Sequence, residues 1–410
     1  MATIVGVEVP AVEARERLVG FVAGIVSGLP HVRQRENAQL YVRGLIEEGP
    51  RKSLQPTLFR LEEGSARYES VQQFLADSPW RPVEVVRRCA ERVAPEIGVE
   101  AWVLDDTGFP KQGKHSPGVK RQYSGTLGKT GNCQIGVSVH AVGARGTAPL
   151  GWALYLPEDW CDDPGRRAKA KIPASVVFKT KPELGVELVE QAAGWDIPAA
   201  PVLGDTAYGD NTSLRDRLDE AGSAYVLAVG AAKFFAPETV FAVPEQTGRQ
   251  GRPWCRLRPD REPETVADLI ARIGSEQART VAFRDGPGGE PVSSPFVFVA
   301  GVRAAHEWQK GSASLRREEL LIAAWPEGHD APVDYWITNL PADTDPERLA
   351  RLARLRWKIE LDYKQLKGEL GLDHYEGRSW IGWHHHTALV TVAHGFLTLE
   401  RLCPRAPRLA

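Results

Sequence analysis

The sequence has 410 residues, a formal net charge of −2, 42% apolar residues and 25% charged residues. Its length allows one large domain with accessories or two to three domains, and its composition excludes a disordered or membrane-embedded chain. The sequence contains no run of about 18 apolar residues, so no membrane span is predicted. The N-terminus lacks the basic segment with which a secretory signal begins. Five scattered cysteines without C-x-x-C spacing favour a reduced cytosol over a zinc cluster.

Helical apolar spacing dominates the first 95 residues. It runs through ENAQLYVRGLIEEG, YESVQQFLADSPW and PVEVVRRCAERVAPEIG, and the third of these helices is expected to stop at Pro95. Residues 1–95 are therefore assigned to a helical N-terminal region.

The period of the apolar residues then changes. The pattern predicts strands at 101–106, 133–142, 149–156, 198–205 and 223–230, and helices at 183–195 and 211–222. This alternation predicts an α/β sheet covered by helices within residues 96–230. Residues 231–332 are rich in Gly and Pro with short apolar pieces, which predicts a β-rich insertion. Residues 333–400 return to a strand at 334–341 and a long helix, and 401–410 form a tail.

The long helix is expected from about Asp345 through Leu370. One apolar stripe runs along it: Leu352, Leu355, Ile359, Tyr363, Leu366 and Leu370. A charged stripe lies beside it: Arg356, Glu360, Lys364 and Lys367. Because Glu360 directly follows the core residue Ile359, its face borders the core. Taken alone, such a stripe is typical of a solvated face.

Two predicted strands end in aspartate. WVLDD ends in Asp105 and Asp106, PVLGD ends in Asp205, and each is followed by Thr and a loop that contains Gly. Functional groups collect at the carboxyl ends of strands in α/β sheets. A carboxylate there is costly unless it is paired, hydrogen-bonded or bound to a metal. For either motif alone, an Asp that caps the turn is the simpler interpretation.

Two Asp at strand ends and one Glu on a core-packed helix can converge as three carboxylates. Oxygen ligands of this kind suit Mg²⁺, and a pair of such ions supports phosphoryl transfer. Two basic segments point to phosphate as well: residues 108–130 hold five Lys/Arg and no acid, and residues 163–181 hold six against one acid. For binding to a nucleic acid, such local stripes of positive charge matter more than the net charge of the whole chain.

Three segments, in order and spacing, resemble the DDE transposases of bacterial insertion sequences: DDTGFPKQGKHSPGVKRQYSGTLGKTGNCQIGVSVHA, VLGDTAYGD and RWKIELDYKQLKGELGLDHYEGRSW. The branch they resemble has Y-x2-R-x3-E-x6-K as its third motif, and the resemblance runs from about residue 40 to residue 400. It implies an RNase H-like mixed-sheet catalytic core with the helical N-terminal region and the β-rich insertion. The signature Tyr falls on Ala353.

The resemblance also assigns the site. It implies Asp106, Asp205 and Glu360 as catalytic residues and metal ligands, with Mg²⁺ as cofactor and Mn²⁺ as a substitute. Arg356 and Lys367 match the R and the second K of the signature, and Lys364 lies between them. All three basic residues are expected to bind DNA phosphates.

The implied function is a DNA transposase. It would bind the terminal inverted repeats of its element, with residues 1–95 as the DNA-end-binding region, and catalyse Mg²⁺-dependent strand cleavage and strand transfer. Its partners would be double-stranded DNA, as element ends and as target, and a second copy in a DNA-bound homodimer, with no membrane. The expected location is the bacterial cytoplasm, at the nucleoid. An aromatic of the insertion could stack on a flipped base: Trp254, Trp308 and Trp325 are candidates, and core packing is the alternative for each.

Other interpretations stay open. A catalytically impaired remnant that binds DNA is favoured by Ala353 and the short C-terminal tail. A carboxylate-pair hydrolase acting on glycosides needs two carboxylates but no basic row. Asp105 competes with Asp106 as first acid, because adjacent strand residues face opposite ways. His384, His385 and His386 suggest a metal tract, against which a polar helix end or interface is the simpler interpretation.

Overall fold

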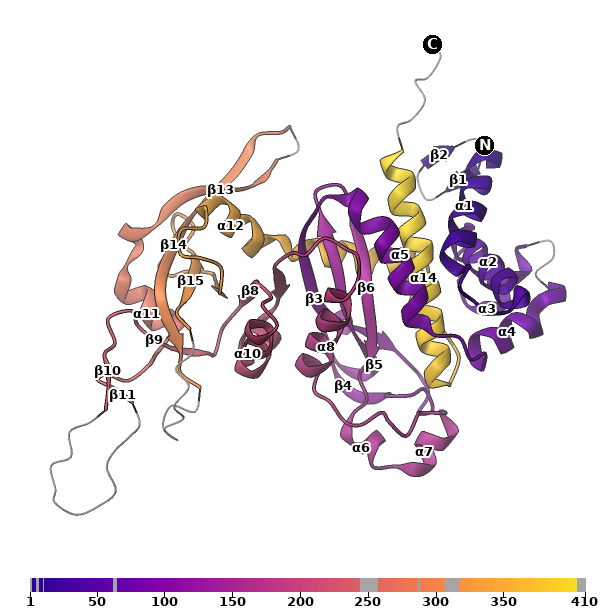
Figure 1. Cartoon of the computed structure of the whole chain (residues 1–410), viewed down its shortest axis with the longest axis horizontal. Helices are drawn as coiled ribbons and strands as arrows, with labels where there is room; N and C mark the ends of the chain where they lie inside the picture. Colours follow the sequence, from indigo (N-terminus) through magenta and orange to yellow (C-terminus); the bar gives the residue numbers. More distant parts are fainter. Residues whose placement is uncertain are drawn as a thin grey trace, which may run out of the picture. The chain divides into compact units, whose positions relative to one another are not determined.

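The computed structural model describes residues 2–4, 7–9, 11–61, 65–243, 257–286, 288–306 and 317–403. The chain divides into two compact units, residues 1–199 with 357–410, and residues 200–356. The first unit is thus made of two separate stretches of sequence (Figure 1). No helix within the described part of the chain is both long enough and apolar enough to span a bilayer.

The first unit is built on antiparallel strands. Its strands are β1 (Ala2–Ile4), β2 (Val7–Val9), β3 (Val99–Pro110), β4 (Lys120–Ser124), β5 (Lys129–Gly143) and β6 (Thr147–Leu154). The long strand β5 pairs with β3 on one edge, and with β4 and then β6 on the other. The predicted strands 101–106, 133–142 and 149–156 are therefore confirmed, and each extends beyond its predicted start or end.

The helices of the first unit are α1 (Ala11–Val26), α2 (Val32–Ile46), α3 (Leu54–Phe59), α4 (Tyr68–Ala76), α5 (Pro82–Ile97), α6 (Glu158–Cys161), α7 (Pro164–Lys169), α8 (Lys181–Ala193), α13 (Trp357–Gly368) and α14 (Trp380–Leu402). Helices α5, α8 and α14 lie against β6, and α1–α4 lie on the far side of α5 and α14 from the strands (Figure 1). The 23-residue helix α14 contacts α2, α4, α5 and β6, so it joins the N-terminal helices to the strands.

Two helix boundaries in the first unit differ from the prediction. Helix α5 continues through Pro95 to Ile97 and ends where Gly98 takes a left-handed φ of 65°. Pro95 lies in the last turn, where it has no N–H to donate to the carbonyl of Glu91, so the helix continues past it with one hydrogen bond fewer. The long helix predicted from Asp345 through Leu370 is two helices, α12 (Pro346–Leu355) and α13, separated at Arg356. No Pro or Gly marks this break.

The second unit is a mixed α/β unit. Its strands are β7 (Val202–Gly204), β8 (Tyr225–Ala228), β9 (Lys233–Phe235), β10 (Phe241–Ala242), β11 (Arg258–Pro259), β12 (Glu264–Thr265), β13 (Arg279–Asp285), β14 (Pro291–Ala304), β15 (Glu319–Ala324) and β16 (Asp334–Thr338). Strands β7 and β8 are parallel, and β8, β16, β15, β14 and β13 then pair antiparallel in that order. Its helices are α9 (Thr206–Gly209), α10 (Thr212–Glu220), α11 (Val266–Ile273) and α12.

The histidine tract lies at an interface inside the first unit, between the start of α14 and the N-terminal region, and not at a polar, solvent-facing helix end. His385 and His386 are fully buried in the second turn of α14. The nitrogens of His385 face the backbone carbonyls of Leu75 and Trp80 at 2.8 and 3.1 Å, and its ring stacks on that of Trp80. Hydrogen bonding of this kind makes burial of an imidazole tolerable.

Of the three tryptophans considered for base stacking, Trp254 and Trp308 lie outside the described residues. The indole N–H of Trp325 donates to the carbonyl of His329 at 2.9 Å.

Candidate active site

Asp105 and Asp106 lie side by side on β3 and face opposite ways. Directly opposite residues of an antiparallel pair share a face, and Asp105 is opposite Ser138 while Asp106 is opposite Val137 of β5. Asp105 is 9% exposed, and the side chain of Asp106 is 22% exposed. The two carboxylates therefore belong to different faces of the sheet, with different neighbours.

Helix α13 packs on the face that carries Asp105. The phenol oxygen of Tyr363 lies 2.8 Å from the hydroxyl oxygen of Ser138. One residue earlier, the carboxylate of Asp362 lies 2.8 Å from Nδ1 of His140, which shares this face because it is two residues along β5 from Ser138. Both contacts join α13 to the Asp105 side of the sheet.

The ionisation of Tyr363 responds to the aspartates. Burial raises the pKa of the Tyr363 phenol well above its usual value, and the negative charges of Asp105 and then Asp106 raise it further. Glu360 is three residues before Tyr363, so the two side chains project from neighbouring positions on α13. Glu360 is exposed. The first unit thus brings the helix of Glu360 to the sheet face of Asp105.

Asp106 faces helix α8. Nζ of Lys181, the first residue of this helix, lies 3.0 Å from Oδ2 of Asp106, and both side chains are partly exposed. Farther along α8, a Cβ built on Gly185 would meet a methyl of Leu104 at 2.6 Å, so a larger residue here would require the Leu104 side chain to shift. Because Leu104 shares its face with Asp106, α8 covers the side of the sheet opposite α13.

Asp205 directly follows β7 in the second unit and is the N-cap of α9. Its side chain accepts a hydrogen bond from the backbone N–H of Ala207 at 2.9 Å. This is the turn-capping role that the sequence allowed for an Asp at a strand end. Capping occupies Oδ1, and a carboxylate has further lone pairs for other partners.

The three basic residues of the signature differ in surroundings. Arg356 is the half-buried residue between α12 and α13. Lys364 is exposed and has no hydrogen bond or ion pair with any residue that the structure describes. Lys367 donates to the carbonyl of Gly108 at 2.7 Å and to Thr126 Oγ1 at 2.9 Å, and burial lowers its pKa to about 8. Its ammonium is thus used to join α13 to the end of β3.

A buried polar cluster next to Glu360 was missed by sequence reasoning. Asp362 lies between His140 of β5 and His394 of α14, with Nε2 of His394 3.5 Å from its carboxylate. Burial opposes ionisation of Asp362, but His394 and His140 together lower the pKa of the carboxyl group below its usual value. The signal was the position of Asp362 directly before Tyr363 of the apolar stripe, which turns it toward the core.

Metal binding is compatible with the chemistry of the donors. Among the described residues, no three or more His, Cys, Asp or Glu side chains are arranged to hold a metal ion. Carboxylates are nevertheless the protein ligands that Mg²⁺ prefers, and it commonly uses one or two of them together with water and substrate phosphates. The Asp105 face, reached by the Glu360 helix, offers such groups.

Comparison with known families decides the classification. The family model described as DDE superfamily endonuclease matches residues 25–289, which is more than half of the chain. The chain belongs to the DDE superfamily endonucleases. The matched region contains Asp105, Asp106 and Asp205, and it ends before Glu360.

The individual proteins that resemble this DDE superfamily endonuclease have low sequence identity to it. It is 28% identical over 204 residues to "Probable transposase for insertion sequence element IS701" of Microchaete diplosiphon, a match that covers 49% of this chain and 50% of that protein. The chain thus spans about half the length of this relative. A solved piggyBac transposase synaptic complex with hairpin DNA aligns with 97% of this chain and 80% of that one, at 11% identity and a TM-score of 0.38. A TM-score this low does not establish a common fold.

Proposed function

We propose that this DDE superfamily endonuclease is the transposase of an insertion sequence, which cuts DNA at the ends of its element and joins them to target DNA. Support comes from the family match and from the similarity to a probable insertion-sequence transposase. The observation that carries the proposal is the packing of the Glu360 helix on the sheet face of Asp105, through Tyr363 and Ser138. An RNase H-like core is part of the proposal.

The proposed site has three carboxylates. Asp205 and Glu360 would act with one aspartate of β3, for which the family motif suggested Asp106. The packing of α13 favours Asp105, because Asp105 shares its face with Ser138, whereas Asp106 faces α8 and pairs with Lys181. We therefore propose Asp105 as first acid and keep Asp106 as the alternative.

The DDE superfamily implies a divalent metal ion, and Mg²⁺, with Mn²⁺ as a substitute, is the proposed one. When bound, such ions lower the pKa of a water and stabilise the leaving oxygen of a phosphodiester. The chain's own part is to hold the DNA strand beside these carboxylates. Arg356 and Lys364 are proposed to bind its phosphates, and Lys367 to do so once DNA competes for the contact that it makes with Gly108.

Two bond exchanges complete the reaction. In the first, a water oxygen bonds to the phosphorus at the element end, and the 3′ oxygen leaves as a free hydroxyl. In the second, this hydroxyl attacks a phosphodiester of the target, whose own 3′ oxygen leaves. Joining two ends requires at least two copies on DNA, so a homodimer is proposed, with residues 1–95 as the end-binding region.

The test is cleavage of a duplex that carries the inverted repeats flanking the gene, by the full chain with Mg²⁺ or with EDTA. We expect cleavage only with Mg²⁺ and its loss in Glu360→Gln. Cleavage by Glu360→Gln would refute the site, and activity in EDTA would favour a metal-independent hydrolase. Binding of ends without any cleavage would favour the second candidate, a DNA-binding remnant, which the buried Ala353 at the signature tyrosine supports.

A further inference from the structure

A basic pocket lies in the first unit, away from the strand contacts of α13. Its volume is about 650 Å³. Four stretches distant in sequence line it: the loop after β3, the first part of β5, helices α6 and α7, and the segment before α14. Its polar lining residues are Lys114, His115, Asn132, Arg166, Lys169 and Arg378. No carboxylate is found among the described residues that line it.

Most of these cationic groups are uncompensated. Lys114, Lys169 and Arg378 are exposed, and none has a hydrogen bond or ion pair with any residue in the described ranges. Arg166 stacks its guanidinium over the ring of Trp160 at 3.7 Å and lies 3.6 Å from Asp159. Cations that converge without acids repel one another, so their arrangement creates a positive potential suited to a polyanion.

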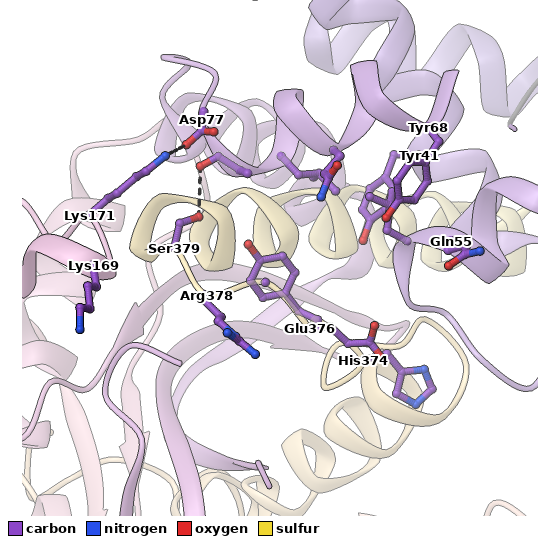
Figure 2. A pocket seen from close by; sticks show the side chains of 16 residues that line it. Tyr41, Gln55, Tyr68, Asp77, Lys169, Lys171, His374, Glu376, Arg378 and Ser379 are labelled. Atoms are coloured by element: carbon purple, nitrogen blue, oxygen red, sulfur yellow. Dashed lines mark hydrogen bonds and ion pairs between the residues drawn. The ribbon is translucent and has the colours of Figure 1, made fainter. Parts of the chain in front are cut away.

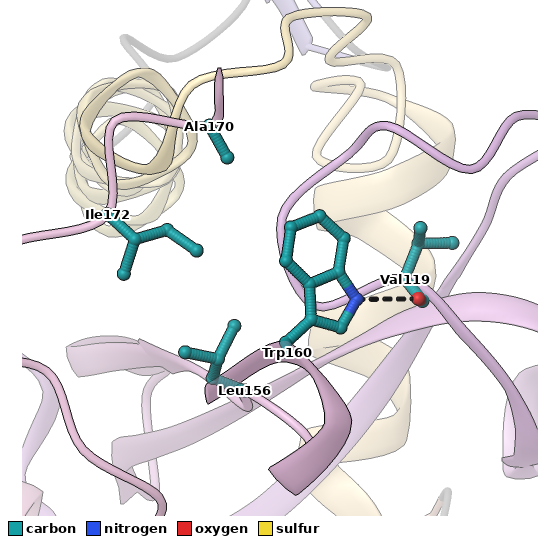
Figure 3. Packing of buried hydrophobic residues seen from close by; sticks show 5 residues of the cluster. All are labelled: Val119, Leu156, Trp160, Ala170 and Ile172. Carbon is teal, nitrogen blue, oxygen red and sulfur yellow. Dashed lines mark hydrogen bonds between the residues drawn. The ribbon is translucent and has the colours of Figure 1, made fainter. Parts of the chain in front are cut away.

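A small apolar core holds the pocket walls together (Figure 3). Val119 of the loop after β3 packs with residues around α6 and α7: Leu156, Trp160, Ala170 and Ile172. The indole N–H of Trp160 donates to the carbonyl of Val119 at 2.8 Å. The two basic segments recognised in the sequence are thereby fixed on one surface. Their cations do not have to be gathered when a ligand binds, which lowers the entropic cost of binding.

The neighbouring pocket has a different charge balance (Figure 2). It shares Lys169 and Arg378 as a wall and has a volume of about 470 Å³. Asp77 and Glu376 line it, and Asp77 forms an ion pair with Lys171. Acids therefore neutralise the charge on that side of the wall, and the excess of positive charge is confined to the basic pocket.

The basic pocket has a defined relation to the strand of the candidate acid. Its loop begins directly after Pro110, the last residue of β3, five residues beyond Asp105. At about 3.3 Å per residue, this is roughly 17 Å along the strand. One strand of B-DNA advances about 3.4 Å per nucleotide, so a strand cut near Asp105 would have phosphates at this distance roughly five nucleotides away.

We propose that the basic pocket binds backbone phosphates of the DNA several nucleotides from the cleaved position, with Lys114, Lys169 and Arg378 as the contacts. This rests on the proposed function for its DNA substrate. Contacts of this type position the duplex without reading its sequence. Binding through them therefore weakens as salt rises, to a similar extent for any duplex of equal length.

The test compares two double variants of the full chain that remove the same charge. Lys169→Gln with Arg378→Gln alters the pocket. Arg145→Gln with Arg279→Gln is the control: both residues are exposed, and neither belongs to residues 1–95 or lines the pocket. Arg145 lies beyond Gly143, the far end of β5, which is roughly 35 Å along the strand from Asn132. Fluorescence anisotropy in EDTA, over a range of salt concentrations, measures binding of a labelled inverted-repeat duplex and of a scrambled duplex.

We expect the pocket variant to bind both duplexes at least about 10-fold more weakly, and its slope of log affinity against log salt to fall by about two. The control variant should keep the wild-type slope. An unchanged slope and affinity in the pocket variant would overturn the proposal. Displacement of the duplex by inorganic phosphate beyond the effect of ionic strength, with an unchanged slope, would also overturn it and indicate a small-anion site.

Failure of the two proposals is distinguishable. If wild-type protein binds the duplex through the pocket but does not cleave it with Mg²⁺, the transposase proposal fails and the binding surface stands. If it cleaves, and the pocket variant binds and cleaves as wild type does, the binding surface fails and the transposase proposal stands. Thermal unfolding of both variants checks that each is folded, as expected for substitutions of exposed side chains.

Discussion

The phenol oxygen of Tyr363 lies 2.8 Å from the hydroxyl oxygen of Ser138, and both residues are buried. This contact fixes the helix of Glu360 on the sheet. We expect Tyr363→Phe to lower the free energy of unfolding by about 1–3 kcal/mol, because a buried hydroxyl of Ser138 loses its partner. Urea denaturation measures the loss. Tyr123→Phe is the matched control, since Tyr123 is 66% exposed, and we expect a change within about 0.5 kcal/mol.

Substitution of the two aspartates of β3 should have different effects on DNA cleavage. We expect Asp105→Asn to reduce Mg²⁺-dependent cleavage by at least about 100-fold, because a metal ligand supports several kcal/mol of transition-state stabilisation. Asp106→Asn should leave most of the cleavage rate and lose only the partly exposed pair with Lys181. Single-turnover cleavage rates of the two variants show which aspartate the reaction requires. The reverse order of the two effects would restore Asp106 as first acid.

The buried His386 should make stability depend on pH. Burial lowers the pKa of His386 to about 4, from an ordinary value of 6.5, and its ring is held by Tyr41. The unfolded chain binds this proton more readily, so stability is full above about pH 6.5 and falls as pH falls toward 4, by about 1.4 kcal/mol per pH unit for this group. Denaturation across this range measures the slope. His386→Gln should reduce the slope by one proton, and an unchanged slope would contradict the assignment.

Lys367 should matter to structure as well as to DNA. We expect Lys367→Met to lower the free energy of unfolding by about 1–3 kcal/mol, because the carbonyl of Gly108 loses its donor while the apolar part of the side chain is kept. Lys364→Met is the control on the exposed side of the same helix, and its stability should change little. Equal stability of the two variants would show that the Gly108 contact does not stabilise the fold.

The buried cluster around Asp362 should be the most sensitive to substitution. Asp362→Asn leaves His140 and His394 without a charged partner in a buried site, and we expect a loss of about 3–5 kcal/mol. Because the pKa of Asp362 is lowered in the folded state, its contribution is present at neutral pH and is lost as pH falls below about 4. Chemical denaturation at pH 4 and pH 2 should show the difference between wild type and variant shrinking at the lower pH.

Local patterns were sufficient for most elements of the first unit. Alternating and continuous apolar runs located β3, β5 and β6, and the stripe that includes Ile359, Tyr363 and Leu366 is buried as predicted. The ends of the helices were harder to predict than their existence. At the break between α12 and α13, Arg356 has helical φ and ψ of −54° and −31°, and no Pro or Gly lies there. Neither helix propensity nor a helix-breaking residue therefore marks this boundary in the sequence.

The sequence alone does not show which face of the sheet carries the candidate site. Alternation along β3 says that Asp105 and Asp106 face opposite ways, but not which side α13 will cover. That depends on the register of β3 with β5 and on the contact of Tyr363 with Ser138, 225 residues away in sequence. The domain assignment, the DNA-end-binding role of residues 1–95 and the roles predicted for the site residues stay predictions: Asp106, Asp205, Glu360, Arg356, Lys364 and Lys367.

The division of the first unit into residues 1–199 and 357–410 has a consequence for biosynthesis. Helix α14, which covers α5 and β6, leaves the ribosome only after residues 200–356 have been made, a stretch of 157 residues. At about 5–20 residues per second, translation of that stretch takes roughly 8–30 s. During this interval Trp152 and His140 lack the helices that later bury them, so a nascent chain stalled here would be a natural substrate for chaperones.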